Sequence, residues 1–344
     1  MSLLKLFLIF TFTTEVTLFA QTKDLLGAGA TFPYPLYSKM FYEYNKKTGI
    51  RTNYQPIGSG GGIKQLKSKT VDFGATDAFI SNQELKDDSL PILHIPMCLG
   101  AVVITYNLPG VTTLKISPDV LAKIFLGTLT VWNDSSLLKS NPNMNLPAKS
   151  IVVVHRSDGS GTTSIFTDYL SKVNQGWKEK VGMGKSVNWP VGIGGKGNEG
   201  VSGYVKQIPG SIGYTELAYT IQNKMPVALI ENRAGNFMKP SLESTSKAAE
   251  VAIPSDTRIS ITNTKSQVGY PIAGFTWIIV YKEQHYGKRT KDKALELLNL
   301  LSWMIHEGQQ FTSPLDYAPL PPAVVGKAEA IIQSITYDGL KVQQ

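Results

Sequence analysis

Three glycine-rich turns, at residues 27–33, 58–62 and 156–163, carry the side chains best suited to bind a small anion. Each turn stands directly before a predicted helix, where backbone N–H groups lack intrahelical partners and the helix dipole is positive. Glycine lets the backbone approach an ion closely. Serine and threonine hydroxyls in the same turns add further donors. Together the three turns predict a site for a tetrahedral oxyanion.

Each turn taken alone is well explained as helix capping, because Ser, Thr and Gly are common at helix starts. The third turn adds Arg156, with Asp158 two residues further on. A planar guanidinium matches phosphate oxygens, and the nearby carboxylate can hold it in place. This combination favours one shared anion site over three unrelated caps.

An acid, Asp77, ends the short strand predicted within residues 71–77. A turn-capping role is one interpretation. The other follows from protonation: an ionised carboxylate only accepts hydrogen bonds, and at neutral pH phosphate still carries a proton whereas sulfate carries none. We therefore predict that Asp77 accepts the phosphate proton and repels sulfate.

The elements that must position these residues alternate along the chain. Extended segments are expected at residues 52–57, 101–106, 150–154 and 275–281, and helices at about residues 33–47, 61–68, 118–126, 160–173 and 293–306. This pattern predicts an α/β fold with mostly parallel sheets. In open α/β sheets, ligands bind beyond the carboxyl ends of the strands, where the three turns are expected.

Composition indicates an exported globular protein with two domains. Of the 344 residues, 42% are hydrophobic and 17% charged. Residues 1–20 combine Lys5, an apolar run at 6–12 and the small residue Ala20, which predicts a cleavable signal peptide. The alternative, a membrane anchor, needs about 20 apolar residues. The only cysteine, Cys98, rules out an intrachain disulfide and is expected to be buried.

Other function classes find weaker support. The net charge of +8 is scattered, and its densest run, at 288–293, reads as a solvated helix start rather than a nucleic-acid site. Residues 192–197 match a dinucleotide-binding GxGxxG motif but read as a loop. Ser160 lies in Gly-Ser-Gly rather than in GxSxG, with only His155 nearby, which reads as a strand-end residue. The histidines, at 94, 155, 285 and 306, lack metal-binding spacing.

These segments closely resemble the periplasmic phosphate-binding proteins of high-affinity phosphate ABC transporters, over nearly the whole mature chain. The matching stretches are residues 27–33, 53–55, 58–59, 71–77, 107–110, 132–134, 156–162, 189–198 and 316–321. Two positions depart from the family pattern: Gly60 and Thr76 stand where serine is common.

The resemblance implies a type II periplasmic-binding-protein fold, in which two α/β lobes joined by a two-strand hinge bury phosphate between them. After the signal peptide (1–20), lobe I is expected to hold residues 21–104 plus 269–344, and lobe II residues 105–268. The ligands that the resemblance implies are Ala30, Thr31, Phe32, Ser59 and Asp77 from lobe I, and Arg156, Ser160, Gly161 and Thr162 from lobe II. Asp158 would orient the guanidinium of Arg156.

By the same resemblance, the chain is expected to be a monomeric binding protein in the periplasm, without a cofactor, metal or catalytic residue. It would deliver phosphate to two permease subunits of an ABC importer with its ATPase subunits. The alternatives are binding of another oxyanion, such as sulfate or molybdate, binding of an organic phosphate, or a phosphate-ester enzyme. Asp77 is the feature that separates phosphate from sulfate.

Overall fold

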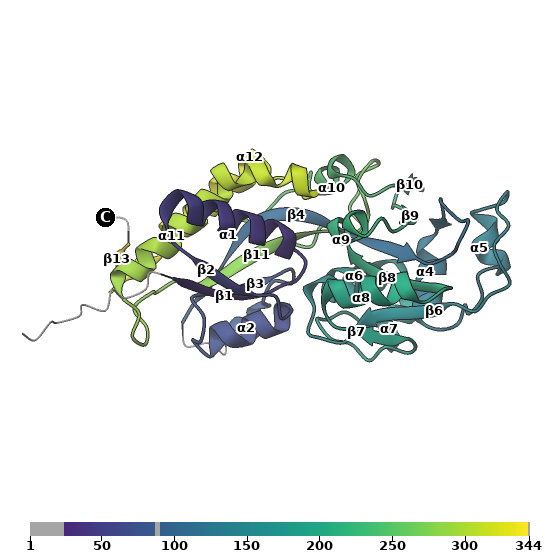
Figure 1. Cartoon of the computed structure of the whole chain (residues 1–344), viewed down its shortest axis with the longest axis horizontal. Coiled ribbons are helices and arrows are strands. Elements are labelled where there is room, and N and C mark those ends of the chain that lie inside the picture. Colours follow the sequence, from purple (N-terminus) through teal and green to yellow (C-terminus); the bar gives the residue numbers. More distant parts are fainter. Residues whose placement is uncertain (1–23, 87–89, 343–344) are drawn as a thin grey trace, which may run out of the picture.

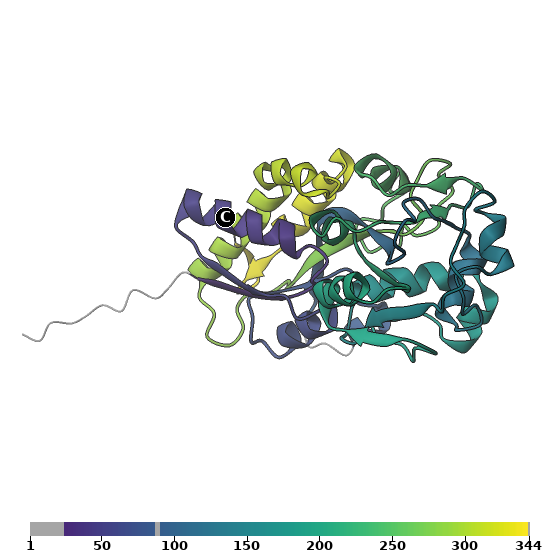
Figure 2. The same cartoon turned by 45° about the vertical axis from the view of Figure 1, so that its right-hand side comes forward.

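The computed structural model describes residues 24–86 and 90–342 and forms two α/β halves side by side (Figure 1). The signal peptide predicted at residues 1–20 lies outside the described residues. No helix in the described part of the chain is long and apolar enough to cross a membrane. Views 45° apart both place the C-terminal helices (yellow) beside the N-terminal helix (purple) (Figures 1 and 2).

The first part of the chain supplies one half and enters the other. Its elements are β1 (Leu25–Gly29), α1 (Tyr34–Thr48), β2 (Thr52–Gln55), α2 (Ser59–Lys67), β3 (Phe73–Thr76), α3 (Asn82–Lys86), β4 (Ile92–Tyr106), β5 (Lys115–Ile116), α4 (Pro118–Phe125), α5 (Ser135–Lys139), β6 (Val152–Arg156), α6 (Gly161–Val173) and α7 (Gln175–Lys180).

The remaining elements complete the second half and return to the first. They are β7 (Ile193–Gly195), α8 (Gly197–Gln207), β8 (Ser211–Glu216), α9 (Leu217–Gln222), β9 (Leu229–Glu231), β10 (Phe237–Met238), α10 (Leu242–Ala248), β11 (Ala273–Tyr281), α11 (Lys291–Ile305), η1 (Glu307–Phe311), η2 (Ser313–Leu315), α12 (Pro322–Gln333), β12 (Thr336–Tyr337) and β13 (Leu340–Lys341).

One sheet of eight strands, in the order β2-β1-β3-β11-β4-β8-β6-β7, runs through both halves. In one half β1 pairs in parallel with β2 and β3, and in the other β6 pairs in parallel with β7 and β8. We call these halves lobe I and lobe II. The strands between them, β4 and β11, are antiparallel to their neighbours. The prediction of mostly parallel sheets therefore holds inside each lobe but not where the lobes join.

The connection between the lobes is a pair of long buried strands. β4 pairs with β11 through Leu99–Phe275 and Ala101–Ala273, and then leaves it to pair with β8 through Val102–Glu216. Both strands are apolar along nearly their whole length, as expected when a strand is covered on both faces. They fit the predicted two-strand hinge. The lobe boundaries at residues 104/105 and 268/269 stay a prediction.

The helices that open onto the cleft begin where the sequence indicated. α1 follows Pro33 and ends at Gly49, whose φ of 75° suits the left-handed cap that glycine provides. α6 is capped by Ser160, whose hydroxyl accepts the N–H of Thr163 at 3.0 Å. Cys98 is buried, as predicted.

One surface prediction holds only in part. The basic run at 288–293 does begin a helix, α11, and residues 288 and 290–292 are exposed, but Arg289 is buried and its guanidinium pairs with Asp72. Lys293 reaches the same carboxylate at 3.0 Å. Sequence spacing could not reveal this, because Asp72 is far away in the chain.

Candidate anion-binding site

The three glycine-rich turns meet where the lobes face each other. The turns follow β1, β2 and β6, and each opens a helix: α1, α2 or α6. The lobes touch directly here, because the N–H of Gly60 donates to the carbonyl of Gly159 at 2.8 Å. The predicted convergence of the turns on one site is therefore what the fold produces.

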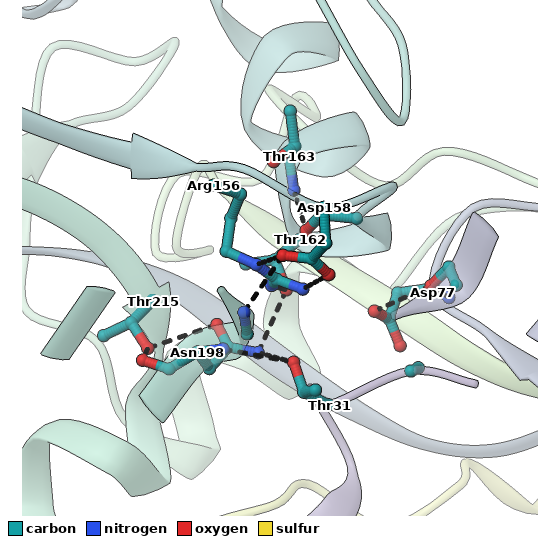
Figure 3. Close-up of polar contacts among 12 residues, drawn as sticks. Thr31, Asp77, Arg156, Asp158, Thr162, Thr163, Asn198 and Thr215 are labelled. Carbon is teal, nitrogen blue, oxygen red and sulfur yellow. Dashed lines mark hydrogen bonds and ion pairs between the residues drawn. The ribbon is translucent and has the colours of Figure 1, made fainter. Parts of the chain in front are cut away.

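Arg156 ends β6 and is 3% exposed. Its Nε donates to Asp158 Oδ1 at 2.7 Å and its Nη2 to Asp158 Oδ2 at 2.5 Å (Figure 3). Nη1 donates to the hydroxyl of Thr162 at 3.2 Å. A guanidinium has five N–H donors, so one remains on each Nη for an anion. This bidentate pair is the contact that the predicted orienting role of Asp158 requires.

This ion pair stays charged although it is shielded from water. Burial is the largest single influence and lowers the pKa of Arg156, but the hydrogen bond and charge of Asp158, together with the charges of Tyr214 and Asp77, raise it by more, and the net shift is upward. Burial raises the pKa of Asp158, but Arg156 and the N–H of Gly197, 3.0 Å from Oδ1, lower it overall. The site therefore holds a fixed guanidinium with two free donors.

The first turn of α6 provides the rest of the lobe II donors. Ser160, Gly161 and Thr162 are fully or nearly fully buried. The N–H groups of Gly161 and Thr162 belong to the helix start, where no intrahelical carbonyl is available. The N–H of Ser160 instead donates to the carbonyl of Lys185 at 2.8 Å, which leaves the Ser160 hydroxyl as its contribution.

Lobe I contributes Thr31, Phe32 and Ser59, which are all buried. Within the described part of the chain, the N–H groups of Thr31 and Phe32 have no hydrogen-bond partner. Ala30 is different: its N–H donates to the carbonyl of Ala75 at 2.9 Å, and its carbonyl accepts the Tyr54 hydroxyl at 2.7 Å. Ala30 therefore anchors the turn through the sheet and has no free backbone donor.

Asp77 directly follows β3 and is 3% exposed. Its Oδ1 accepts the hydroxyl of Thr276 at 2.8 Å, and Ser59 lies 3.4 Å from Oδ2. Burial raises the pKa of Asp77 to about 7, against the lowering effects of Thr276, Arg156 and Ser59. An acid poised near neutrality can be ionised or protonated according to what it faces.

An apolar cavity of about 300 Å³ borders Asp77 on one side. Its lining includes Phe79, Ile165 and Trp277. This apolar neighbourhood explains why desolvation dominates the pKa of Asp77. The carboxylate is the boundary between a polar anion site and an apolar interlobe space.

Close approach of the two lobes depends on glycine. A Cβ on Gly161 would lie 2.5 Å from both Asp77 Oδ2 and the Ser59 hydroxyl. Gly58 has a φ of 86°, and a Cβ there would collide with the Asp158 carboxylate. Thr76 uses its hydroxyl to hold the carbonyl of Ala78 at 2.6 Å, so this departure from the family pattern shapes the turn that carries Asp77.

Sequence reasoning missed Asn198, which donates to Thr31 and Thr162, and the hydroxyl of Thr276 beneath Asp77. It also interpreted residues 192–197 as a loop. The structure shows instead a short strand, β7, leading into α8, and Gly197 supports Asp158. A signal was available: like the three predicted turns, this is a glycine-rich segment directly before a helix.

The two residues that suggested an enzyme, His155 and Ser160, make no hydrogen bond to each other among the described residues. His155 is half-buried in β6, stacks on Trp189 and has Nδ1 3.0 Å from the Arg156 carbonyl oxygen. The Ser160 hydroxyl caps α6. Among residues 24–86 and 90–342, no group of three His, Cys, Asp or Glu could hold a metal ion. The geometry is that of an oxyanion cage rather than of a nucleophile with its base.

Fold and site together define a two-lobed protein that encloses a small anion between its lobes. Residues 19–307 match the model of the PBP superfamily domain, and the chain belongs to this superfamily. A solved periplasmic phosphate-binding protein described as bound with phosphate has the same fold, with a TM-score of 0.71 at 20% identity, covering 89% of this chain and 93% of its own.

Curated relatives narrow the family further. The chain is 46% identical to the phosphate-binding protein PstS of Xylella fastidiosa strain 9a5c, covering 90% of this chain and 85% of that protein. It is 44% identical to PstS of Haemophilus influenzae, covering 89% and 92%. With PstS of Methanocaldococcus jannaschii it shares 40% identity, covering 82% and 78%. Within the superfamily, the chain belongs to the PstS family of phosphate-binding proteins.

Proposed function

We propose that this protein binds inorganic phosphate between its lobes and delivers it to a phosphate ABC importer. The proposed ligands are Thr31, Phe32, Ser59 and Asp77 of lobe I and Arg156, Ser160, Gly161 and Thr162 of lobe II, with Ala30 anchoring its turn and Asp158 orienting Arg156. The observation that carries the proposal is the buried acceptor Asp77 among these donors.

Selectivity follows from the mismatch between donors and acceptors. The guanidinium of Arg156, the backbone N–H groups at the starts of α1 and α6, and the serine and threonine hydroxyls would hold any tetrahedral oxyanion. The ionised Asp77 needs a ligand that brings a proton, which phosphate does and sulfate does not. A buried carboxylate facing a fully deprotonated anion would lose a hydrogen bond and add repulsion. The structure of the site therefore favours phosphate over sulfate, and over molybdate on the same ground.

The working cycle is a hinge motion. The donors lie on both lobes, so only the closed molecule can bind the anion from both sides. The anion therefore binds the closed form more tightly than the open form, and this difference in affinity stabilises closure. We propose that the closed monomer, exported to the periplasm by its signal peptide, docks on two permease subunits that act with ATPase subunits. The PstS names of the relatives support this transporter context.

Titration calorimetry on the mature chain tests the proposal. We expect tight one-to-one binding of phosphate at pH 8 that excess sulfate does not compete away. Equal affinity for phosphate and sulfate would overturn the assignment of the ligand. Release of p-nitrophenol from p-nitrophenyl phosphate, abolished by Ser160→Ala, would instead favour the phosphate-ester enzyme.

A further inference from the structure

Asn198 lies where the two lobes meet and has no role in the site proposed so far. It is in the first turn of α8, directly after β7 of lobe II, and its exposed fraction is 0%. Its side chain reaches Thr31 of lobe I and Thr162 of lobe II (Figure 3). A buried amide that touches a proposed ligand on each lobe can control both.

The hydroxyl oxygen of Thr31 accepts two hydrogen bonds from Asn198. The backbone N–H lies 3.2 Å from it, and Nδ2 lies 2.9 Å from it. A threonine hydroxyl has one donor and two acceptor positions. Both acceptor positions of Thr31 are therefore filled by N–H groups, and the hydroxyl can act toward a ligand only as a donor.

Thr162 is constrained in the same way from two directions. Its hydroxyl oxygen accepts Nη1 of Arg156 at 3.2 Å and Nδ2 of Asn198 at 3.2 Å. Both acceptor positions are again occupied by nitrogen donors. The two hydroxyls, one on each lobe, thus have protons that are free only to point toward an acceptor such as an anion oxygen.

The orientation of the Asn198 amide is fixed by the groups behind it. Oδ1 accepts the backbone N–H of Glu216 at 3.2 Å and faces the hydroxyl of Thr215 at 3.2 Å. A backbone N–H can only donate, so the carbonyl oxygen of the amide must face it. Nδ2 must then face the threonines.

We propose that Asn198 is a positioning residue that commits the hydroxyls of Thr31 and Thr162 to donate to the bound anion. The inference rests on the proposed phosphate function and deepens it. Around these two hydroxyls the site then presents only donors, which suit ligand oxygens that carry no proton. The protonated oxygen of the ligand is left to face Asp77. Because Asn198 of lobe II holds Thr31 of lobe I, the same contact also couples hydroxyl orientation to closure.

Two substitutions separate this role from simple packing. Asn198→Asp keeps the size of the side chain but replaces the Nδ2 donor by an acceptor, so both hydroxyls would turn toward the carboxylate and away from phosphate. Asn198→Ala removes the donor without adding an acceptor. We expect phosphate affinity at pH 8, measured by calorimetry, to fall by about 10-fold in N198A and by at least about 100-fold in N198D.

A pH profile provides a readout that packing alone would not change. A protonated carboxyl at position 198 regains a donor, so N198D should recover affinity relative to N198A as the pH falls from 8 to 5. Three charged residues are linked to this position: Arg156 donates to the same Thr162 hydroxyl, Asp158 accepts the N–H of the preceding residue, Gly197, and Glu216 donates its backbone N–H to Asn198 Oδ1. All three residues remain in N198A. The pH profile of phosphate affinity in N198A therefore contains any effect of their titration and serves as the reference for N198D.

Asn141→Asp is the matched control. Asn141 is also buried in lobe II, its Nδ2 donates to the carbonyls of Lys115 and Leu137, and its Oδ1 accepts the N–H of Lys115. N141D should cost stability in thermal unfolding but keep phosphate affinity within about 3-fold of wild type. If N198D does not fold, the similarly sized but apolar Asn198→Leu takes its place and should bind like N198A.

The outcomes distinguish this inference from the function on which it rests. A wild-type protein that binds no phosphate would overturn both. A wild-type protein that binds phosphate, together with N198A and N198D of equal affinity or N198L of wild-type affinity, would overturn the role of Asn198 alone. Weaker binding by N198D than by N198A, with recovery only in N198D at low pH, would establish it.

Discussion

The two faces of the cleft differ in what their ligands offer. The lobe II face holds the only buried cation among the proposed ligands, Arg156, and is braced from within its own lobe by Asp158 and Gly197. The lobe I face holds Asp77, which is the only carboxylate among the proposed ligands and is supported by Thr276. Lobe II is thus built to attract an oxyanion, and lobe I to choose among oxyanions. Affinity and selectivity then depend mainly on different lobes, so a substitution in one lobe should change one of these properties more than the other.

Removing the cation of lobe II should have the largest effect. Arg156→Ala deletes the donors left on Nη1 and Nη2 and leaves the Asp158 carboxylate unpaired beside the anion. Truncating one partner of a buried charge pair costs about 2–5 kcal/mol, so calorimetry should show roughly a 1,000-fold loss of affinity, for phosphate and sulfate alike. Arg51→Ala is the control, because the guanidinium of Arg51 donates to both carboxylate oxygens of Asp24 in an exposed ion pair. A loss under 10-fold would contradict the division of roles.

A methyl group on Gly161 should block closure without harming lobe II. Its Cβ would lie 2.5 Å from Asp77 Oδ2, across the cleft. We expect Gly161→Ala to weaken phosphate binding by about 100-fold, while thermal unfolding without phosphate changes little, because Gly161 is the first residue of α6 and alanine costs the helix nothing there. Gly203→Ala on α8, with no heavy atom within 4 Å of its Cβ, is the matched control. Unchanged affinity in G161A would mean that the lobes need not approach this closely.

Neutralising the acid of lobe I should alter the choice of anion. Asp77→Asn exchanges an acceptor for a possible donor of the same shape. A hydrogen bond to a charged group contributes about 1.5–3 kcal/mol, so the phosphate-to-sulfate affinity ratio should fall by roughly 10- to 100-fold. Competition calorimetry measures this ratio. Asp134→Asn, at the half-buried N-cap of α5, should leave the ratio unchanged. An unchanged ratio in D77N would remove the selective role from lobe I.

The wild-type protein should show the same effect through pH. Burial raises the pKa of Asp77 to about 7. Above this pH the carboxylate accepts the ligand proton and opposes sulfate, whereas below it the protonated acid can donate to a sulfate oxygen. Sulfate should therefore compete better at pH 5.5 than at pH 8, by about 10-fold, and D77N should not show this gain. Sulfate competition independent of pH in the wild type would contradict a titrating Asp77.

The sequence predicted the proposed ligands better than the residues that support them. Arg156 and Asp158 lie two residues apart, and the glycine turns precede helices, so local pattern sufficed to predict them. Thr276 of β11 is 199 residues from Asp77, and Asn198 of α8 is 167 residues from Thr31, so nothing in local spacing relates either residue to the partner that it meets across the fold. Arg289 was misjudged for the same reason, because its partner Asp72 is brought to it only by the fold.

The smallest expected effect concerns a contact that crosses the cleft outside the anion cage. Lys185 Nζ lies 3.2 Å from Glu84 Oε1, with 25% and 46% of the side chains exposed. Exposed pairs contribute about 0–1 kcal/mol, so Lys185→Ala should weaken phosphate binding by at most about 5-fold at low salt. The loss should vanish at about 1 M salt, where the Debye length is about 3 Å.

The control for this pair is Lys123→Ala, whose partner Asp119 lies one turn away on the same lobe. It should leave affinity unchanged at any salt concentration. A larger, salt-resistant loss in K185A would show that Lys185 acts on the anion directly. It would then have to be counted with Arg156 among the charges by which lobe II attracts its ligand.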